Sequence, residues 1–226
     1  MDTADLKRWT GTAGIVGTIL QVVALGPFFT AGEPPSGTDP NQLVSYLSRN
    51  SSLIETSLLL SLLGFGVIAV FLGGLWGLLQ RAGQEHAWLA TATFGLGIIT
   101  LVMGYAAYAT IGAAAADASS RADPGTARTL YILAGVLGGA TTAMPVAFFL
   151  AVTGWALART ALLGRWAVWL SEIAAILVLA TVPAIYGGDD ASAFYSATGI
   201  VTVLALLPLY AWTLAISIGI LRSRRI

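Results

Sequence analysis

The sequence predicts an all-α fold, a bundle of six transmembrane helices with a short amphipathic helix in its first outer loop. Of the 226 residues, 57% are hydrophobic and only 10% are charged, whereas about 25% of the residues of a soluble domain are charged. The mean hydropathy is +0.82. Because so few polar side chains cannot cover a water-soluble globule, we expect the lipid bilayer to be the main partner of this chain.

Six stretches contain the roughly 20 mostly apolar residues that a helix needs to cross the hydrocarbon core of a bilayer. They are residues 11–31, 55–80, 87–112, 129–158, 166–186 and 194–221 of a single domain, residues 1–226. The fourth and sixth stretches exceed one hydrocarbon thickness and contain Pro145 and Pro208 near their middles. Since proline removes a backbone hydrogen bond, we expect these two helices to tilt or kink.

The cations in the short loops predict the orientation. Eight lie on the side that the two termini share, namely Lys7, Arg8, Arg81, Arg159, Arg165, Arg222, Arg224 and Arg225. Three lie on the other side, namely Arg49, Arg121 and Arg128. Loops rich in Lys and Arg stay in the cytoplasm, so we expect both termini there. Ten Arg to one Lys, with abundant Ala, indicate a GC-rich bacterial gene and therefore a bacterial cytoplasmic membrane.

The first outer loop, residues 32–54, is long enough to hold structure. Asp39, Pro40 and Gln42 read as an N-cap, a first-position proline and a capping box. They predict a short helix that ends near Arg49. Its apolar side chains, Leu43, Tyr46 and Leu47, fall on one face, which suits a helix lying at the membrane surface or covering the mouth of the bundle.

Other helix ends are also marked in the sequence. Ser52, with Glu55 three residues later, forms a second capping box that would open the second span. Residues 113–116, all alanine, are expected to extend the third helix outward until the chain breaks at residues 123–125, Asp-Pro-Gly. The adjacent Asp189 and Asp190 in the last outer loop are expected to cap the next helix or face water, with weak binding of a hard cation as the alternative.

Residue counts exclude several kinds of chemistry. The single histidine, His86, cannot supply two haem ligands, and a chain without cysteine lacks thiol chemistry and the usual zinc ligands. A net charge of zero without a long basic run argues against nucleic acid as a partner. No clustered acids, and no serine paired with a base, occur at membrane depth. We therefore expect no cofactor, no metal site and no enzymatic activity.

Glu172, Arg165 and Gln21 are the candidate ligand or ion residues. Glu172 is the one ionisable residue inside a predicted span, and such residues are the default functional candidates in membranes. Arg165 precedes it by seven residues and so shares its helix face. Glu172 could pair with Arg165 or another cytoplasmic arginine, or it could bind a proton or cation in a cavity. Gln21, midway along the first helix, is expected to form an interhelical hydrogen bond.

Small residues predict a packing surface. Gly73 and Gly77 on the second helix, and Gly135 and Gly139 on the fourth, form two small-xxx-small pairs. Such pairs let helix backbones approach closely. We expect these helices to pack tightly, either inside one bundle or against a membrane protein partner or a second copy of the chain.

Residues 159–170, Arg-Thr-Ala-Leu-Leu-Gly-Arg-Trp-Ala-Val-Trp-Leu, resemble a junction of uncharacterised six-helix integral membrane proteins from actinobacteria. In that family, a helix ending in Arg is followed by a helix that begins Leu-Pro-Arg-Trp-Leu-x-Trp-Leu, and here Gly164 stands where proline is usual. The resemblance covers these twelve residues and the six-helix layout. It implies a domain of unknown function with six helices, so it supports the fold and adds no site residue.

Two functions remain open from the sequence. A non-enzymatic membrane component that binds a partner protein, a lipid or a small ligand is favoured, because the spans are poor in charge and their polar residues are mostly Thr and Ser. The alternative is a small secondary transporter or exporter that uses Glu172. Pro145, Pro208 and three hairpins that each open with a cation near a tryptophan are consistent with transport, because transporters often contain repeats and broken helices.

Overall fold

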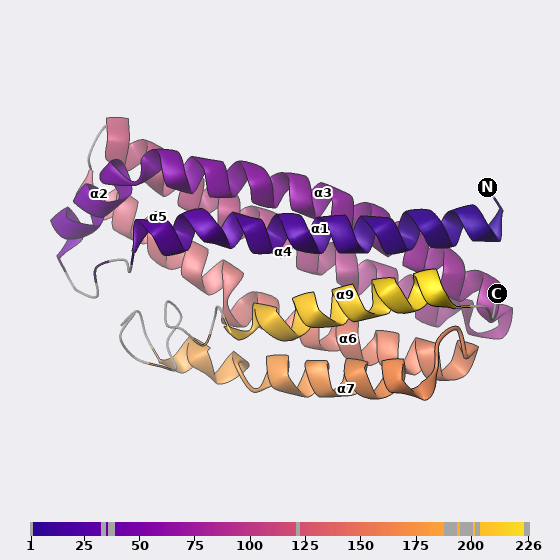
Figure 1. The fold of residues 1–226 in the computed structure, drawn as a ribbon. Helices are drawn as coiled ribbons and strands as arrows, with labels where there is room; N and C mark the ends of the chain where they lie inside the picture. The colour runs from indigo at the N-terminus through magenta and orange to yellow at the C-terminus, as the bar shows by residue number, and fades with distance from the viewer. Residues whose placement is uncertain are drawn as a thin grey trace.

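A computed structural model describes residues 2–32, 35, 39–120, 123–187, 194, 201 and 204–223 of the chain. Within these residues the structure is helical and contains no strand. The long helices lie side by side along one common direction, so the molecule is an elongated bundle (Figure 1). The predicted all-α class is therefore confirmed.

The helices follow one another along the chain with short connections. Their bounds are α1, Thr3–Ala31; α2, Pro40–Arg49; α3, Ser51–Ala82; η1, Gln84–His86; α4, Ala87–Ser120; α5, Pro124–Gly138; α6, Ala140–Thr160; α7, Arg165–Leu179; η2, Val182–Tyr186; and α9, Leu206–Arg222. Among the described residues, five helical stretches are long and apolar enough to cross a membrane: Thr3–Ala31, Ser51–Ala82, Gln84–Ser120, Pro124–Thr160 and Arg165–Tyr186. The apolar helix α9 is shorter, with 17 residues.

The first and last described helices meet at the same end of the bundle. Figure 1 shows both termini there, and the Lys7 ammonium donates a hydrogen bond to the main-chain carbonyl of Ser223 at 3.2 Å. α1 and α9 also pack against each other. The two ends of the chain therefore lie on the same side of the helical bundle.

The capping residues Asp2 and Asp39 determine where α1 and α2 begin. α1 begins at Thr3, eight residues before the predicted span, because the Asp2 carboxylate accepts a hydrogen bond from the backbone N–H of Asp5. α2 has the predicted Asp39 cap and the predicted end at Arg49. The predicted cap at Ser52 is wrong. α3 already begins at Ser51, since Asn50 alone separates it from α2.

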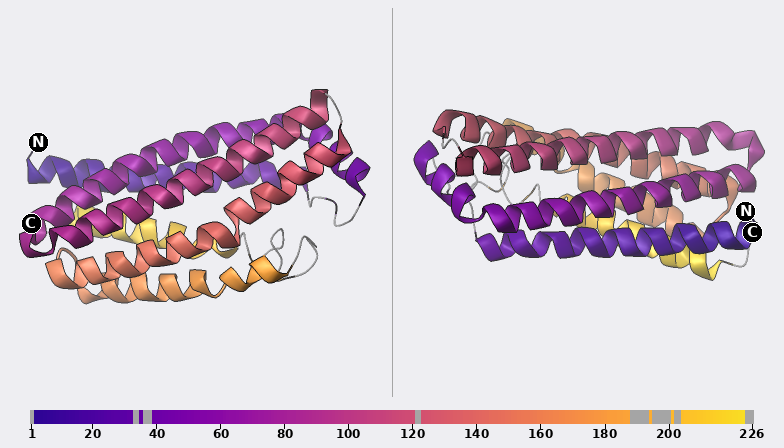
Figure 2. Two further views of the ribbon diagram at one scale, coloured as in Figure 1. Left: turned by 180° about the vertical axis from the view of Figure 1, so that it is seen from behind. Right: turned by 90° about the horizontal axis from the view of Figure 1, so that it is seen from above.

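The fourth predicted span is two helices, with the break at Gly139 rather than at Pro145. Gly139 has φ −92° and ψ −117°, which is not helical, and α6 then continues through Pro145 without interruption. The Thr142 hydroxyl donates a hydrogen bond to the carbonyl of Leu137 across the break. The adjacent Gly138 and Gly139 allow this change of direction, which is visible in Figure 2.

The sixth predicted span is described from residue 204 onward and at positions 194 and 201. Pro208 is the third residue of α9. Its missing N–H therefore falls in the first turn, where backbone donors have no partner within the helix. Asp189 and Asp190 lie outside the described residues.

The buried side chains form two clusters. The larger follows the bundle through α1, α3, α4, α6, α7 and α9 and includes Phe71, Leu150 and Trp212. The smaller lies at the end opposite the termini, where Leu43 and Leu47 of α2 pack on the C-terminal end of α4 and the N-terminal part of α5. α2 thus covers that end of the bundle (Figure 1), which is the second of its two predicted placements.

The predicted close packing between the second and fourth helices does not occur within the described bundle. α3 packs mainly against α1 and α4 and meets α6 only marginally. The glycine at the tight contact is Gly74, where an added Cβ would lie 2.0 Å from the Thr10 hydroxyl oxygen. Around Gly73 no atom lies within 4 Å of an added Cβ. Contact with a second copy through these glycines stays a prediction.

Candidate functional site

Gln21 lies at the interface between α1 and α3, and its side chain is 1% exposed. Its amide nitrogen donates a hydrogen bond to the main-chain carbonyl of Ser61 at 2.9 Å. Gly64 makes room for this amide, since an added Cβ there would lie 2.7 Å from the Gln21 nitrogen. One turn away, the Ser57 hydroxyl donates to the carbonyl of Ala24 at 2.6 Å. These bonds join the two helices, as predicted for Gln21.

Two acceptors at this interface lack hydrogen-bond partners. Within the described part of the chain, neither the side-chain oxygen of Gln21 nor the hydroxyl oxygen of Ser61 has one. Both residues are buried. An unsatisfied buried polar group costs about 1–3 kcal/mol, so a donor that reached these oxygens would recover free energy.

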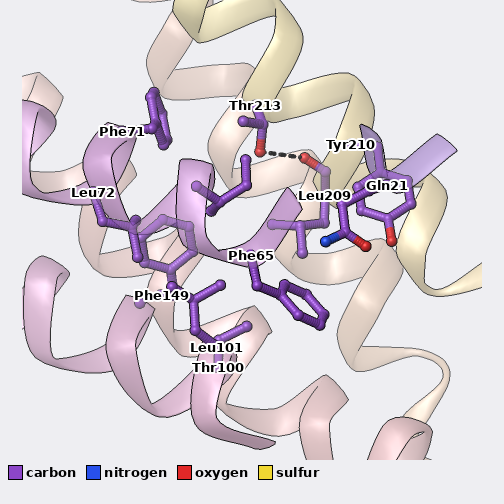
Figure 3. A pocket seen from close by; sticks show the side chains of 12 residues that line it. Gln21, Phe65, Phe71, Leu72, Thr100, Leu101, Phe149, Leu209, Tyr210 and Thr213 are labelled. Carbon is purple, nitrogen blue, oxygen red and sulfur yellow. Dashed lines mark hydrogen bonds between the residues drawn. The ribbon is translucent and has the colours of Figure 1, made fainter. Parts of the chain in front are cut away.

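A cavity of about 50 Å³ lies beside Gln21 (Figure 3). Five helices form its wall, which is mostly apolar. The lining residues are Gln21 of α1; Phe65, Ile68, Phe71 and Leu72 of α3; Gly97, Thr100 and Leu101 of α4; Phe149 of α6; and Leu209, Tyr210 and Thr213 of α9. None of these residues is charged. A buried water needs about 10–15 Å³ of such space, so the cavity holds roughly four waters or a group of similar size.

The polar groups of this wall are mainly acceptors. The Thr100 hydroxyl donates its proton to the carbonyl of Leu96 at 3.0 Å, and Thr213 donates to Leu209 at 2.8 Å, the bond drawn in Figure 3. Both hydroxyls therefore offer only lone pairs to the cavity. The unpartnered oxygen of Gln21 is a third acceptor, and the phenol of Tyr210 can donate or accept. An occupant that donates a hydrogen bond fits this arrangement best.

Aromatic rings hold the apolar side of the cavity in place. The Trp212 indole is fully buried and packs edge-on against Phe71 and Phe149, with ring centroids 6.3 Å and 5.3 Å away. Its N–H donates a hydrogen bond to the Ser171 hydroxyl oxygen at 2.7 Å. This hydrogen bond joins α9 to α7. The indole also holds the two cavity residues Phe71 and Phe149 in place by packing against their rings.

Tyr105 and Tyr108 of α4 both pack against Phe65. The ring centroids lie 5.2 Å and 5.6 Å from that of Phe65. Tyr105 is partly exposed and donates a hydrogen bond to the carbonyl of Leu62 at 3.0 Å. Tyr108 lies beside Ser61. Tyr108 is therefore part of the interior polar region, which a helix-by-helix view of the sequence does not show.

Glu172 is half-buried on α7 and lies against α6. An added Cβ at Gly154 would lie 2.6 Å from one of its carboxylate oxygens, so the glycine leaves the space that this oxygen occupies. Arg165 is exposed at the start of α7. Across the described residues no ion pair joins Glu172 to Arg165 or to another arginine, and Glu172 does not line the cavity. The structure thus separates Gln21 from the other two candidates.

The end of the bundle that α2 covers has its own polar features. A hollow of about 590 Å³ is lined by Ala31, Pro35, Asn41, Gln42, Ser45, Tyr46, Arg49 and Asn50. Burial raises the pKa of Tyr46, whose hydroxyl donates to the carbonyl of Gly32 at 3.0 Å. The lining residues with a charged or amide side chain all lie on α2 or directly after it, namely Asn41, Gln42, Arg49 and Asn50. This hollow is open, and no buried side-chain atom among its described lining residues lacks a hydrogen-bond partner.

Asp123 caps α5. Its carboxylate accepts hydrogen bonds from the Thr126 hydroxyl at 2.6 Å and from the backbone N–H of Gly125 at 3.3 Å. The Thr126 bond, followed by the Gly125 bond, lowers the pKa of this carboxyl. In the part of the chain that the structure describes, no three His, Cys, Asp or Glu residues gather in a way that could hold a metal ion.

Comparisons of the chain with models of protein families, with curated proteins and with solved structures find no match.

Proposed function

We propose that the protein is a non-enzymatic component of a bacterial cytoplasmic membrane that binds a small neutral ligand in the cavity beside Gln21. The observation that carries this proposal is Gln21, a residue of the cavity lining whose buried side-chain oxygen has no partner among the described residues. A buried acceptor normally has a partner. A bound donor supplies the partner that the chain itself does not.

The lining residues define the chemical class of the ligand. The wall has no charge, so a charged occupant would lose its hydration without gaining a counter-ion. The acceptors call for a donor such as a hydroxyl group, and the apolar wall calls for a short hydrocarbon body. With about 50 Å³ available, either a small alcohol or the hydroxyl end of a longer apolar molecule fits.

The same proposal includes six membrane spans with both termini in the cytoplasm. Five long apolar stretches and the shorter helix α9 support the span count. The orientation is supported by the cations, which are concentrated on the side of the two termini. Loops of this composition remain in the cytoplasm. α2 and the outer ends of α4 and α5 then lie on the opposite side of the membrane.

The test is untargeted mass spectrometry of molecules that stay bound when the protein is purified in mild detergent. The wild type is compared with Gln21→Leu, which removes the free acceptor, and with Thr18→Ala. Thr18 is a matched control, since it is buried one turn away on α1 and does not line the cavity. We expect a neutral hydroxyl compound in the wild type and the control and its loss in Gln21→Leu. Equal retention by all three proteins would refute a ligand at Gln21.

The alternative, a small secondary transporter that uses Glu172, is supported by the absence of an ion pair to that carboxylate among the described residues. We place it second, because Glu172 lies outside the cavity lining and a coupling acid is expected near the substrate. Proton-driven flux into proteoliposomes distinguishes the two functions. If Glu172→Gln abolished transport and Gln21→Leu left it unchanged, transport would become the favoured function over ligand binding.

A further inference from the structure

Two side chains of the cavity lining lack partners, and they differ in what they offer. The side-chain oxygen of Gln21 is an acceptor, and it has no donor among the described residues. The phenol of Tyr210 carries a proton that it can donate, and within the described part of the chain it makes no hydrogen bond. Both residues line the cavity, one from α1 and the other from α9 (Figure 3). An occupant that serves both must donate as well as accept.

Gln21 and Tyr210 lie at the same depth in the bundle. α1 and α9 run antiparallel (Figure 1), and they meet where an added Cβ on Gly14 would lie 3.1 Å from the Cβ of Ser217. Gln21 is seven residues after Gly14, and Tyr210 is seven residues before Ser217. Each of these steps leads two turns, about 10 Å, away from the termini. The acceptor and the donor therefore belong to the same end of the cavity.

The other end of the cavity is apolar. The Phe71 ring lies 2.8 Å from an added Cβ on Gly14, and so about two turns nearer the termini than the polar end. At Gly97 an added Cβ would lie 2.8 Å from a methyl carbon of Leu72 and 3.3 Å from the Phe149 ring. Gly97, Leu72 and Phe149 all line the cavity. The missing side chain of Gly97 thus leaves room between them for a few carbon atoms.

This arrangement distinguishes between small molecules by their hydrogen-bonding groups. Ketones, ethers and alkanes bring no donor to the Gln21 oxygen. Amines donate but are charged at neutral pH, and the lining residues carry no counter-ion. A hydroxyl group both donates and accepts. Water does the same but leaves the apolar end unfilled, whereas an alcohol places its carbon atoms there.

We propose that the cavity selects alcohols, with the hydroxyl group between Gln21 and Tyr210 and the carbon chain directed toward Phe71 and Phe149. The hydroxyl donates to the Gln21 side-chain oxygen and accepts from the Tyr210 phenol. Tyr210 and Gly97 are specificity-determining residues, the first through its proton and the second through the space it leaves. Alcohol selection rests on the proposed function, because it assigns the ligand class and its orientation at the same site.

The test compares propan-2-ol with propanone, since the two have nearly the same shape and only the alcohol has a hydroxyl proton. Saturation-transfer NMR of the full chain in nanodiscs of deuterated phosphatidylcholine gives both dissociation constants. We expect the wild type to bind propan-2-ol about tenfold more tightly than propanone, the difference made by one hydrogen bond. Gln21→Leu should abolish this preference, because it removes the acceptor. Tyr210→Phe should weaken both compounds, each on the order of tenfold, because both accept from the phenol.

Matched controls separate the site from general effects on the bundle. Gly97→Ala fills part of the apolar end, and we expect it to weaken the binding of both compounds. Gly95→Ala adds the same methyl group to α4 at a position where no atom lies within 4 Å, and we expect no change. Tyr131→Phe, on α5 and outside the cavity lining, is the control for Tyr210→Phe and should also leave both dissociation constants unchanged.

A longer probe, octan-1-ol, distinguishes a free small alcohol from the hydroxyl end of a longer molecule. Tighter binding of octan-1-ol than of propan-2-ol, corrected for the fraction dissolved in lipid, identifies the longer molecule, and weaker binding identifies the small alcohol.

Two results would overturn alcohol selection and leave a cavity ligand in place. One is equal affinity of the wild type for propan-2-ol and propanone, with both weakened by Gly97→Ala. The other is a preference for propan-2-ol that persists in Gln21→Leu. Affinities that Gly97→Ala leaves unchanged would place both probes outside the cavity and overturn the proposal. Binding of neither compound to the wild type would refute the proposed function as well.

Discussion

The Gln21 side chain joins α1 to α3 through one atom and keeps another available. Its nitrogen donates to the Ser61 carbonyl at 2.9 Å, while its oxygen has no partner among the described residues, and the residue is part of the cavity lining. A purely structural glutamine would be expected to use both ends of its amide. The nitrogen therefore holds α1 against α3, while the oxygen is available to a ligand.

Gln21→Leu is expected to cost little stability while it removes ligand binding. The substitution loses an interhelical hydrogen bond worth about 0.6–1.7 kcal/mol and also removes an unsatisfied acceptor that costs about 1–3 kcal/mol. The net effect on thermal unfolding in detergent should therefore lie between a loss of about 0.7 kcal/mol and a gain of about 2.4 kcal/mol. A loss several times larger, in protein free of ligand, would show that both ends of the amide are already satisfied.

Adjacent glycines on α3 should respond oppositely to alanine. Gly74→Ala places a Cβ 2.0 Å from the Thr10 hydroxyl oxygen, and overpacking of this kind costs about 1–3 kcal/mol. Gly73→Ala meets nothing within 4 Å, so its unfolding temperature should be unchanged or slightly higher. If Gly73→Ala instead destabilised the protein in a concentration-dependent manner, Gly73 would lie in a contact between two copies, as its sequence spacing suggests.

Trp212 and Ser171 should behave as a coupled pair. Ser171→Ala leaves the buried indole N–H without its acceptor, at a cost of about 1–3 kcal/mol. Trp212→Phe removes that donor and leaves a void beside Phe149. Because the hydrogen bond exists only once, the double variant should be no less stable than Trp212→Phe alone, as measured by chemical denaturation. Strictly additive losses would mean that the bond contributes nothing.

Acidification should loosen the start of α5. The bonds from Thr126 and Gly125 lower the pKa of Asp123 in the folded protein. Its capping therefore stabilises the helix above the unfolded-state pKa of about 3.9 and is lost as the pH falls through the lower folded-state value. Hydrogen exchange of the first amides of α5, measured between pH 6 and pH 3 and corrected for intrinsic rates, should show faster opening at low pH. Asp123→Asn should flatten this dependence.

Short sequence patterns predict the parts of the fold that depend on residues close together in the chain. The apolar stretches predict the long helices because a bilayer requires them, and Asp39 with Pro40 predicts the start of α2. The break at Gly139 does not follow from the sequence pattern, in which Pro145 is the stronger helix-breaking signal. That proline is accommodated inside α6, whereas two consecutive glycines change the direction of the chain. The cap at Ser52 failed because α2 and α3 are joined by Asn50 alone.

The candidate site was only partly predictable. Gln21 stood out as a lone amide in an apolar helix, but the cavity depends on how five helices meet, and no single segment encodes that. Tyr210 and Thr213, which complete its polar wall, sit in an ordinary apolar stretch of α9. Glu172 was identified from its depth, while its contact with Gly154 and its lack of a pairing arginine within the described chain required the packing of α6 on α7.

A ligand site in the core is tested most directly by high-resolution experimental density inside the cavity, for protein purified from its native membrane in mild detergent. We expect a non-protein feature larger than water within hydrogen-bonding distance of the Gln21 oxygen, about 2.7–3.2 Å, and its absence in Gln21→Leu. An empty cavity in the wild type, or density that water alone explains in both proteins, would contradict the proposed function.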